Sequence, residues 1–266
     1  MLDPSAVAVF ADLREEGQEL DSLVRELPGP SWARPTPASG WTVAHQIAHL
    51  HWTDRAALLS LTDAPGFAGM VQEALAAPDT FVDEGAEEGA ALAPAELLAR
   101  WQAGRTALDE ALAAASPDTR FPWYGPPMKA ASMASARLME TWAHGQDVAD
   151  ALGVRRTPTQ RLRHVARIGV RARDYAYAVR GLPAPAGEFR VELTAPDGAG
   201  LWAYGPEDAV QRVTGPALDF CLLVTQRAHR ADLALTATGA DADRWLDIAQ
   251  AFAGPAGPGR APGASR

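Results

Sequence analysis

Two histidines and a glutamate in this chain have the residue types and the spacing of a metal site. Glu140 and His144 lie four residues apart in the stretch 137–150, whose pattern predicts a helix. Residues four apart project from one face of a helix, so this carboxylate and imidazole can hold a single metal ion. His49, in the stretch 41–50, is the candidate for a third ligand from another helix. Two histidines and one carboxylate leave coordination positions open, which is typical of a catalytic metal.

Each of these signals also has a structural explanation. A Glu-x-x-x-His pair often stabilises a helix, and a single histidine is more often a core or surface residue than a ligand. The metal is favoured because Arg137, Glu140, His144 and Asp147 form one polar stripe on a helix that otherwise looks buried. Buried charges need partners or a metal. Gln46, Asp54 and Asp147 are possible hydrogen-bond partners for the imidazoles.

The first half of the chain predicts four helices that position these side chains. They are expected at 4–27, 42–61, 94–115 and around 137–150, with Thr42 capping the second and Gly153 ending the last in a left-handed conformation. Residues 62–93 are rich in Pro, Gly and acids and predict a long irregular connection, in which the acidic run 83–88 is solvated surface. Four helices with one long connection suit a bundle with a metal site in its core.

After Gly153 the pattern changes to that of a small α+β domain. An Arg-rich helix is expected at 159–180, strands at 189–193, 201–204, 209–213 and 232–238, and helices at 216–228 and 241–252. The fold class is therefore α+β, mainly α. The expected domains are a bundle at 1–153, the α+β domain at 154–253 and a disordered tail at 254–266.

Composition narrows the possible functions. The net charge is −9, but residues 1–150 hold 9 basic and 22 acidic side chains and residues 151–266 hold 15 basic and 11 acidic ones. The acidic first part argues against nucleic-acid binding there. The sequence contains neither an apolar run long enough for a membrane span nor a signal peptide, and a single cysteine excludes an internal disulfide. We therefore expect a cytoplasmic protein, and the oligomeric state, monomer or homodimer, stays open.

The two motifs together resemble the DinB-like superfamily. Residues 41–50 (WTVAHQIAHL) and 137–147 (RLMETWAHGQD) are similar to its mycothiol-dependent maleylpyruvate isomerase branch, and 201–206, 213–215 and 219–227 are similar to the small C-terminal domain of that branch. The resemblance implies a four-helix bundle with a His, Glu, His metal site whose ligands match His49, Glu140 and His144. The metal motif is fairly specific for the superfamily, but it does not specify the reaction.

The resemblance also implies a chemistry. A divalent metal, zinc above all, binds mycothiol or another low-molecular-weight thiol as thiolate at neutral pH. The thiolate then adds to an electrophilic carbon, and for isomerisation the addition permits rotation before the thiol leaves. In the isomerases an arginine of the C-terminal domain assists, and Arg227 is the matching position here. Its neighbours Gln226 and Ala228 differ from the small, Gly-rich residues of the family pattern.

Other residues are candidates for the substrate pocket. Trp123 and Tyr124 belong to a proline-stiffened loop before the Glu140 helix, where they either wall a pocket or plug the end of the bundle. Trp52 and Arg137 complete the candidate substrate-binding set. A position in the hydrophobic core would also account for Trp52. Arg163, Arg167 and Arg171 recur along one helix, but solvent exposure is the commoner explanation. Cys221 lies among apolar residues and is expected to be buried and inert.

Three functions follow from this sequence. The first is a metal-dependent isomerase or S-transferase that acts on a small electrophilic metabolite through a thiol. The second is a biosynthetic enzyme that uses the metal without a thiol, with His45 as a candidate general base one turn from His49. The third is a noncatalytic metal-binding or sensing module, which would not need an open coordination position.

Overall fold

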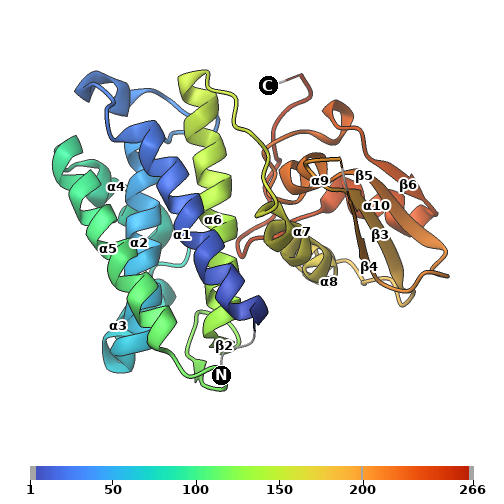
Figure 1. Cartoon of the computed structure of the whole chain (residues 1–266), viewed down its shortest axis with the longest axis horizontal. Coiled ribbons are helices and arrows are strands. Elements are labelled where there is room, and N and C mark those ends of the chain that lie inside the picture. The colour runs from blue at the N-terminus through green and yellow to red at the C-terminus, as the bar shows by residue number, and fades with distance from the viewer. Residues whose placement is uncertain (1–3, 199, 264–266) are drawn as a thin grey trace. The chain divides into compact units, whose positions relative to one another are not determined.

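A computed structural model describes residues 4–198 and 200–263. The chain divides into two compact units, Met1–Arg155 and Arg156–Arg266. It is mainly helical with a small sheet in the second unit, as the sequence predicts (Figure 1). Within the described residues, we find no helix that combines the length and the apolar character of a membrane span.

The first unit is a helical bundle. The long helices α1, α2, α5 and α6 run side by side in Figure 1, and α1 packs on α5 and α6 while α2 packs on α4, α5 and α6. Its core is built from apolar side chains that include Leu20, Ile47, Leu97, Trp101 and Val148. In chain order the elements are α1 (Pro4–Val24), η1 (Gly29–Ala33), α2 (Val43–Thr62), α3 (Ala64–Ala76), α4 (Phe81–Ala90), α5 (Pro94–Ala114), β1 (Arg120–Phe121), β2 (Met128–Lys129) and α6 (Ala130–Leu152).

Two helix ends form as the sequence predicts. Thr42 is the N-cap of α2 and forms a capping box with the His45 side chain. Gly153 ends α6 with φ = 70°, and Val154 donates its backbone N–H to the Ala149 carbonyl. These two ends set where the helices that carry the ligand candidates begin and stop.

The expected irregular connection at 62–93 is wrong, because the structure has helices α3 and α4 there. Helix α4 lies so close to α2 that a Cβ added at Gly89 would be 2.6 Å from the Ala48 Cβ atom, and one added at Gly85 would be 2.8 Å from the Trp52 indole nitrogen. The two glycines weaken the local helical signal, and the close packing that they allow compensates for it.

The second unit packs helices against a four-stranded sheet. The strand order is β4-β3-β5-β6, with β3 and β5 parallel and the other neighbours antiparallel. Buried Cys221 on α9 faces the Leu162 carbonyl of α7 at 3.5 Å. The elements are α7 (Leu162–Arg171), α8 (Arg173–Ala178), β3 (Phe189–Thr194), β4 (Leu201–Tyr204), β5 (Gln211–Pro216), α9 (Ala217–Val224), η2 (Arg230–Asp232), β6 (Thr236–Thr238) and α10 (Ala240–Ile248). The single helix expected at 159–180 is thus divided between α7 and α8.

Candidate metal centre

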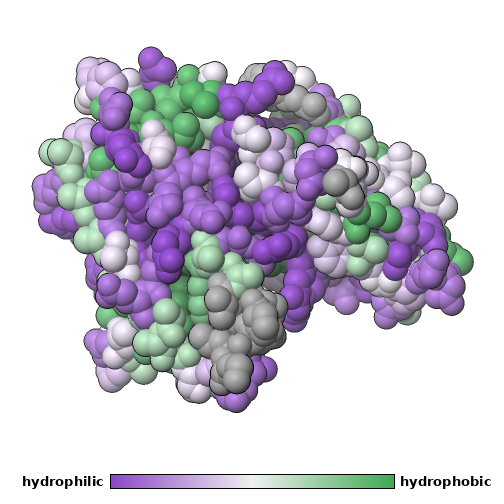
Figure 2. Space-filling model, viewed as in Figure 1, coloured by the Kyte–Doolittle hydropathy of each residue, from purple (hydrophilic) through white to green (hydrophobic). Residues whose placement is uncertain are grey.

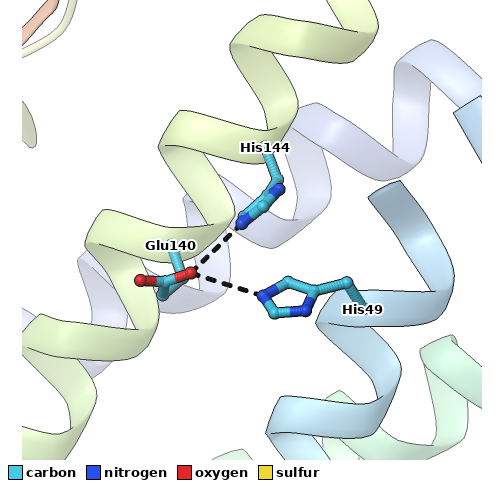
Figure 3. Close-up of side chains that lie close together, drawn as sticks. All are labelled: His49, Glu140 and His144. Carbon is cyan, nitrogen blue, oxygen red and sulfur yellow. Dashed lines mark hydrogen bonds and ion pairs between the residues drawn. The ribbon is translucent and has the colours of Figure 1, made fainter. Parts of the chain in front are cut away.

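Helices α2 and α6 bring the three ligand candidates together. The Nε2 atoms of His49 and His144 lie 3.6 Å and 3.2 Å from Oε2 of Glu140, and one ligand atom from each residue lies within 4.8 Å of the others. Figure 3 shows both imidazoles pointing at the same carboxylate, His49 from α2 and Glu140 and His144 from α6. Residues 91 positions apart in the chain therefore meet because the two helices pack side by side.

The donor set fits a divalent metal ion. Nitrogen and oxygen ligands bind zinc at about 2.0–2.2 Å, so two ligands in a tetrahedral site lie about 3.3 Å apart. The two distances to Glu140 Oε2 bracket that value. His49 and His144 can each supply a neutral nitrogen, and Glu140 can supply a negative charge. Three such ligands leave a coordination position for a further group.

The Glu140 carboxyl is held in its ionised form. Burial by itself would raise its pKa, but hydrogen bonds and charge from His144 and His49 outweigh burial and hold the pKa well below the usual value. An ionised carboxylate accepts hydrogen bonds and binds cations without first losing a proton. Glu140 is thus ready to act as a metal ligand at neutral pH.

Trp41 covers the two histidines. Its ring stacks on that of His144 with centroids 5.9 Å apart and lies 5.3 Å from the His49 ring. The indole N–H donates to Oδ1 of Asp83 on α4 at 3.0 Å. Neither residue is among the site residues expected from the sequence, although Trp41 directly precedes the cap residue Thr42. Asp83 belongs to the acidic run expected to be solvated surface, and it is exposed but also anchors the tryptophan.

A row of aromatic rings connects the histidines to the β1–β2 hairpin. Trp52 lies 6.2 Å from the His49 ring and 4.8 Å from Phe81. Phe81 is 6.1 Å from Tyr124, which is 5.2 Å from Trp123. The predicted residues Trp52, Trp123 and Tyr124 therefore belong to one connected apolar wall. Burial raises the pKa of Tyr124 to about 12, so its hydroxyl stays protonated.

Arg137 pairs with a carboxylate rather than with the histidines. Its Nε donates to Oδ1 of Asp54 at 2.9 Å. Among the described residues Asp54 has no hydrogen bond to an imidazole, in contrast to the expectation from the sequence. The guanidinium is only 2% exposed, and among the described residues its Nη2 atom has no hydrogen-bond partner. A buried guanidinium with a spare donor on the helix of Glu140 is suited to an anionic group.

His45 caps α2. Its Nδ1 accepts a hydrogen bond from the Thr42 backbone N–H at 3.2 Å, and its Nε2 lies 3.3 Å from a carboxylate oxygen of Glu87 on α4. Because Nδ1 is the acceptor, the ring proton is on Nε2 and faces Glu87. Nδ1 is thus engaged in the helix cap, whereas Nε2 lies near Glu87 without a hydrogen bond among the described residues.

Arg227 belongs to the second unit, directly after α9. Its guanidinium donates to the Thr225 carbonyl at 2.7 Å. The backbone N–H groups of Arg227 and Gln226 donate to the carbonyls of Leu222 and Leu223, which is the Schellman pattern of a helix end. Gln226 occupies the left-handed position with φ = 58°, where glycine is usual. The departure from a Gly-rich sequence therefore leaves the turn itself intact.

A polar cavity lies elsewhere in the first unit. It measures about 380 Å³, opens between α1 and α5, and is lined in part by Arg14, Arg105 and Asp109 but by none of the ligand candidates. Figure 2 shows a hydrophilic surface over α1 and α5. Arg14 pairs with Asp109 at 3.5 Å and Arg105 pairs with Asp21 at 3.3 Å, so the charges of this surface largely satisfy one another.

Comparison with protein families identifies relatives of both units. The family model described as Mycothiol maleylpyruvate isomerase N-terminal domain matches residues 13–149, which include all three ligand candidates. A second model, described as Wyosine base formation, matches residues 185–238. The first match confirms the resemblance inferred from the motifs around His49 and Glu140.

Relatives and solved structures extend this similarity to most of the chain. Two uncharacterized proteins of Mycobacterium tuberculosis, from strains CDC 1551 / Oshkosh and ATCC 25618 / H37Rv, are each 58% identical over 260 residues, covering 98% of this chain and 100% of the relative. The crystal structure of the mycothiol-dependent maleylpyruvate isomerase has a TM-score of 0.59 at 17% identity, covering 87% of this chain and 92% of that one. A histidine-to-alanine mutant of the same isomerase matches with the same TM-score at 16% identity. The structural matches establish a shared fold.

Proposed function

The chain belongs to the mycothiol maleylpyruvate isomerase N-terminal domain family, and from that premise we propose that it is a metal-dependent isomerase or S-transferase. The substrate is a small electrophilic metabolite, and the reaction uses mycothiol or another low-molecular-weight thiol. The observation that carries the proposal is the convergence of His49, Glu140 and His144, whose donor types and spacing fit a divalent ion with an open position.

The ligands favour zinc, and His49, Glu140 and His144 would hold it. When bound, the ion supplies the positive charge that keeps a thiol in its thiolate form at neutral pH. Side chains of the protein bind the substrate and exclude water. Arg137 offers its spare Nη2 donor to an anionic group of the substrate, and Trp41 and Trp52 keep water away from the histidine rings. Trp123 and Tyr124 extend the apolar wall against which the substrate lies.

Arg227 is proposed as the second catalytic residue, by its match to the arginine of the isomerases. Its role would be to stabilise negative charge that develops on the substrate, for which an always-protonated guanidinium is suited. His45 is better explained as a helix cap than as a general base, because its acceptor nitrogen binds the Thr42 N–H group. The contacts of His45 therefore favour the thiol-dependent hypothesis over thiol-independent chemistry.

The test combines metal analysis with turnover. Purified protein is assayed for bound divalent metal as isolated and after incubation with zinc, and then for isomerisation of maleylpyruvate and for S-transfer to electrophilic substrates, with and without mycothiol. We expect one metal per chain and activity that requires both metal and thiol. Wild-type protein that neither carries nor accepts a stoichiometric divalent metal would refute the proposal. Metal-loaded protein with full turnover in the absence of thiol would instead favour the thiol-independent enzyme.

A further inference from the structure

A chain of hydrogen bonds connects His144 to the loop that precedes α2. The Nδ1 atom of His144 lies 2.5 Å from Oε1 of Gln46, and Nε2 of Gln46 donates to Oγ1 of Thr36 at 2.9 Å. The Thr36 hydroxyl donates in turn to the Trp41 carbonyl at 2.9 Å. Gln46 is 0% exposed, so solvent does not compete for these bonds.

The donors and acceptors of these hydrogen bonds can be assigned in only one way. A hydroxyl carries a single proton, and that of Thr36 goes to the Trp41 carbonyl, which can only accept. Thr36 therefore accepts from Gln46, so the amide NH₂ group faces Thr36 and the amide oxygen faces His144. That oxygen accepts only, so Nδ1 of His144 must carry a proton.

We propose that Gln46 is a positioning residue that fixes the tautomer and the ring orientation of His144. With one proton held on Nδ1, the neutral ring that would bind a metal has its lone pair on Nε2, the atom beside Glu140. Thr36 sets the direction of the Gln46 amide, and the backbone sets that of Thr36. The inference rests on the proposed metal centre, because its measurable consequence is the affinity of that centre.

The loop that anchors the chain is itself held by backbone bonds. Val43 donates its N–H to the Arg34 carbonyl at 3.0 Å, and Thr36 donates its N–H to the Trp41 carbonyl at 2.8 Å. The same residue, Trp41, therefore stacks on the His144 ring through its indole and ends the hydrogen-bond chain through its carbonyl. His49 differs, because among the described residues its Nδ1 has no hydrogen-bond partner. The site thus has one histidine of fixed tautomer and one without this constraint.

Four variants test the proposal. Gln46→Met keeps the size of the side chain but removes the acceptor, and Gln46→Glu keeps an acceptor and adds a buried charge. Thr36→Val removes the hydroxyl that directs the amide. The matched control is Ser60→Ala, a buried residue of α2 whose hydroxyl bonds the Pro122 carbonyl away from the site. The dissociation constants for Zn²⁺ and Co²⁺ and the visible spectrum of the Co²⁺ form are measured for each, with circular dichroism as the check on folding.

We expect Gln46→Met to weaken metal binding about 10–100-fold and to change the Co²⁺ spectrum. Gln46→Glu should bind metal at least as tightly as wild type, Thr36→Val should fall between Gln46→Met and the control, and Ser60→Ala should match wild type. A residue needed only for packing would give the reverse order, because an apolar methionine disturbs a buried site less than a charged glutamate does.

The outcomes separate this inference from the proposed function. If wild-type protein binds no metal, the metal centre is wrong and the inference falls with it. If wild type binds metal while Gln46→Met and Thr36→Val bind it with unchanged affinity and spectrum, the metal centre stands and the role of Gln46 is refuted. If Gln46→Met does not fold, the other two variants decide. Unchanged affinity and spectrum in Thr36→Val, together with weaker metal binding in Gln46→Glu, would then refute the role of Gln46.

Discussion

Arg137 and Asp54 form an ion pair inside the bundle, with the guanidinium Nε 2.9 Å from the carboxylate oxygen and the two residues only 2% and 4% exposed. The pair joins α6 to α2 about one helical turn from Glu140 and from His49. It therefore links the same two helices that carry the ligand candidates. The effect on stability of removing a charge from this ion pair can be compared with that of removing a ligand from the candidate metal centre.

Removing the carboxylate should destabilise the protein strongly. Asp54→Ala leaves the Arg137 guanidinium buried without a counter-charge, which costs about 3–5 kcal/mol. The free energy of unfolding, measured by urea titration, gives the loss. The control is the double variant Asp54→Leu/Arg137→Met, which replaces the pair by apolar groups and should recover most of the stability. A loss below about 1 kcal/mol in Asp54→Ala would show that the charge is solvated.

Removing a ligand should remove the metal but not the fold. Glu140→Ala and His144→Ala leave two protein ligands, and two ligands do not offset the dehydration of a divalent ion. The bundle keeps its apolar core, so circular dichroism should be unchanged while bound metal and turnover are lost. Full metal occupancy in Glu140→Ala would mean that the ligand set is wrong.

The metal-free protein should lose stability in acid through Glu140. The histidines hold the pKa of its carboxyl well below the ordinary value of 4.5, so ionised Glu140 stabilises the fold above pH 4.5, and this stabilisation is lost as the pH falls through the lowered pKa. Urea unfolding from neutral pH to about pH 3 should show a smaller acid-induced loss for Glu140→Gln than for wild type. Parallel pH profiles for the two proteins would contradict the lowered pKa.

A glycine at position 226 should stabilise the second unit. Gln226 has φ = 58°, a conformation that costs a residue with a Cβ atom about 1–2 kcal/mol, whereas glycine adds about 0.4–1 kcal/mol of entropy to the unfolded chain. The net gain expected for Gln226→Gly is about 0.5–1 kcal/mol, seen as a higher Tm. Gln226→Ala is the control, since it removes the same side chain but keeps Cβ, and it should show no gain.

The arginine beside this turn should affect turnover and leave the metal in place. Arg227→Ala removes the guanidinium that donates to the Thr225 carbonyl, while the Schellman turn depends on backbone bonds that remain. We expect full metal content, a normal circular dichroism spectrum and a large loss of kcat. Arg227→Lys keeps the charge without the planar group and should recover only part of it. Undiminished turnover in Arg227→Ala would end the match to the isomerase arginine and leave the metal centre standing.

Sequence patterns predict those parts of this fold that depend on one residue with one local role. Thr42 and Gly153 are of this kind, because a capping hydroxyl and a left-handed residue act within a few positions of themselves. Helix α4 is not, since its glycines are explained only by the closeness of Ala48 and Trp52 on α2. Local propensity therefore missed a helix that tertiary packing stabilises.

The same distinction applies to the site. The i, i+4 spacing placed Glu140 and His144 together, the stretch 41–50 offered His49 as a third candidate, and the family motif matched all three; that these residues bind a metal stays a prediction. Gln46 was a candidate partner of an imidazole, but the direction of its amide depends on Thr36, ten residues earlier in a loop. Asp83 could not be found from the sequence, because nothing in an acidic run distinguishes the residue that a distant indole contacts.

The buried position of Cys221 has a consequence for a protein that we propose uses a small thiol. The side chain is 0% exposed, and burial raises the pKa of its thiol far above the ordinary value. Thiol–disulfide exchange needs an accessible thiolate, so the folded chain cannot form a mixed disulfide with a small thiol at its own single cysteine. The rate at which a thiol reagent labels Cys221 consequently reports how often the second unit opens. Measuring this labelling rate at increasing urea concentrations would follow the opening of the second unit separately from the unfolding of the bundle.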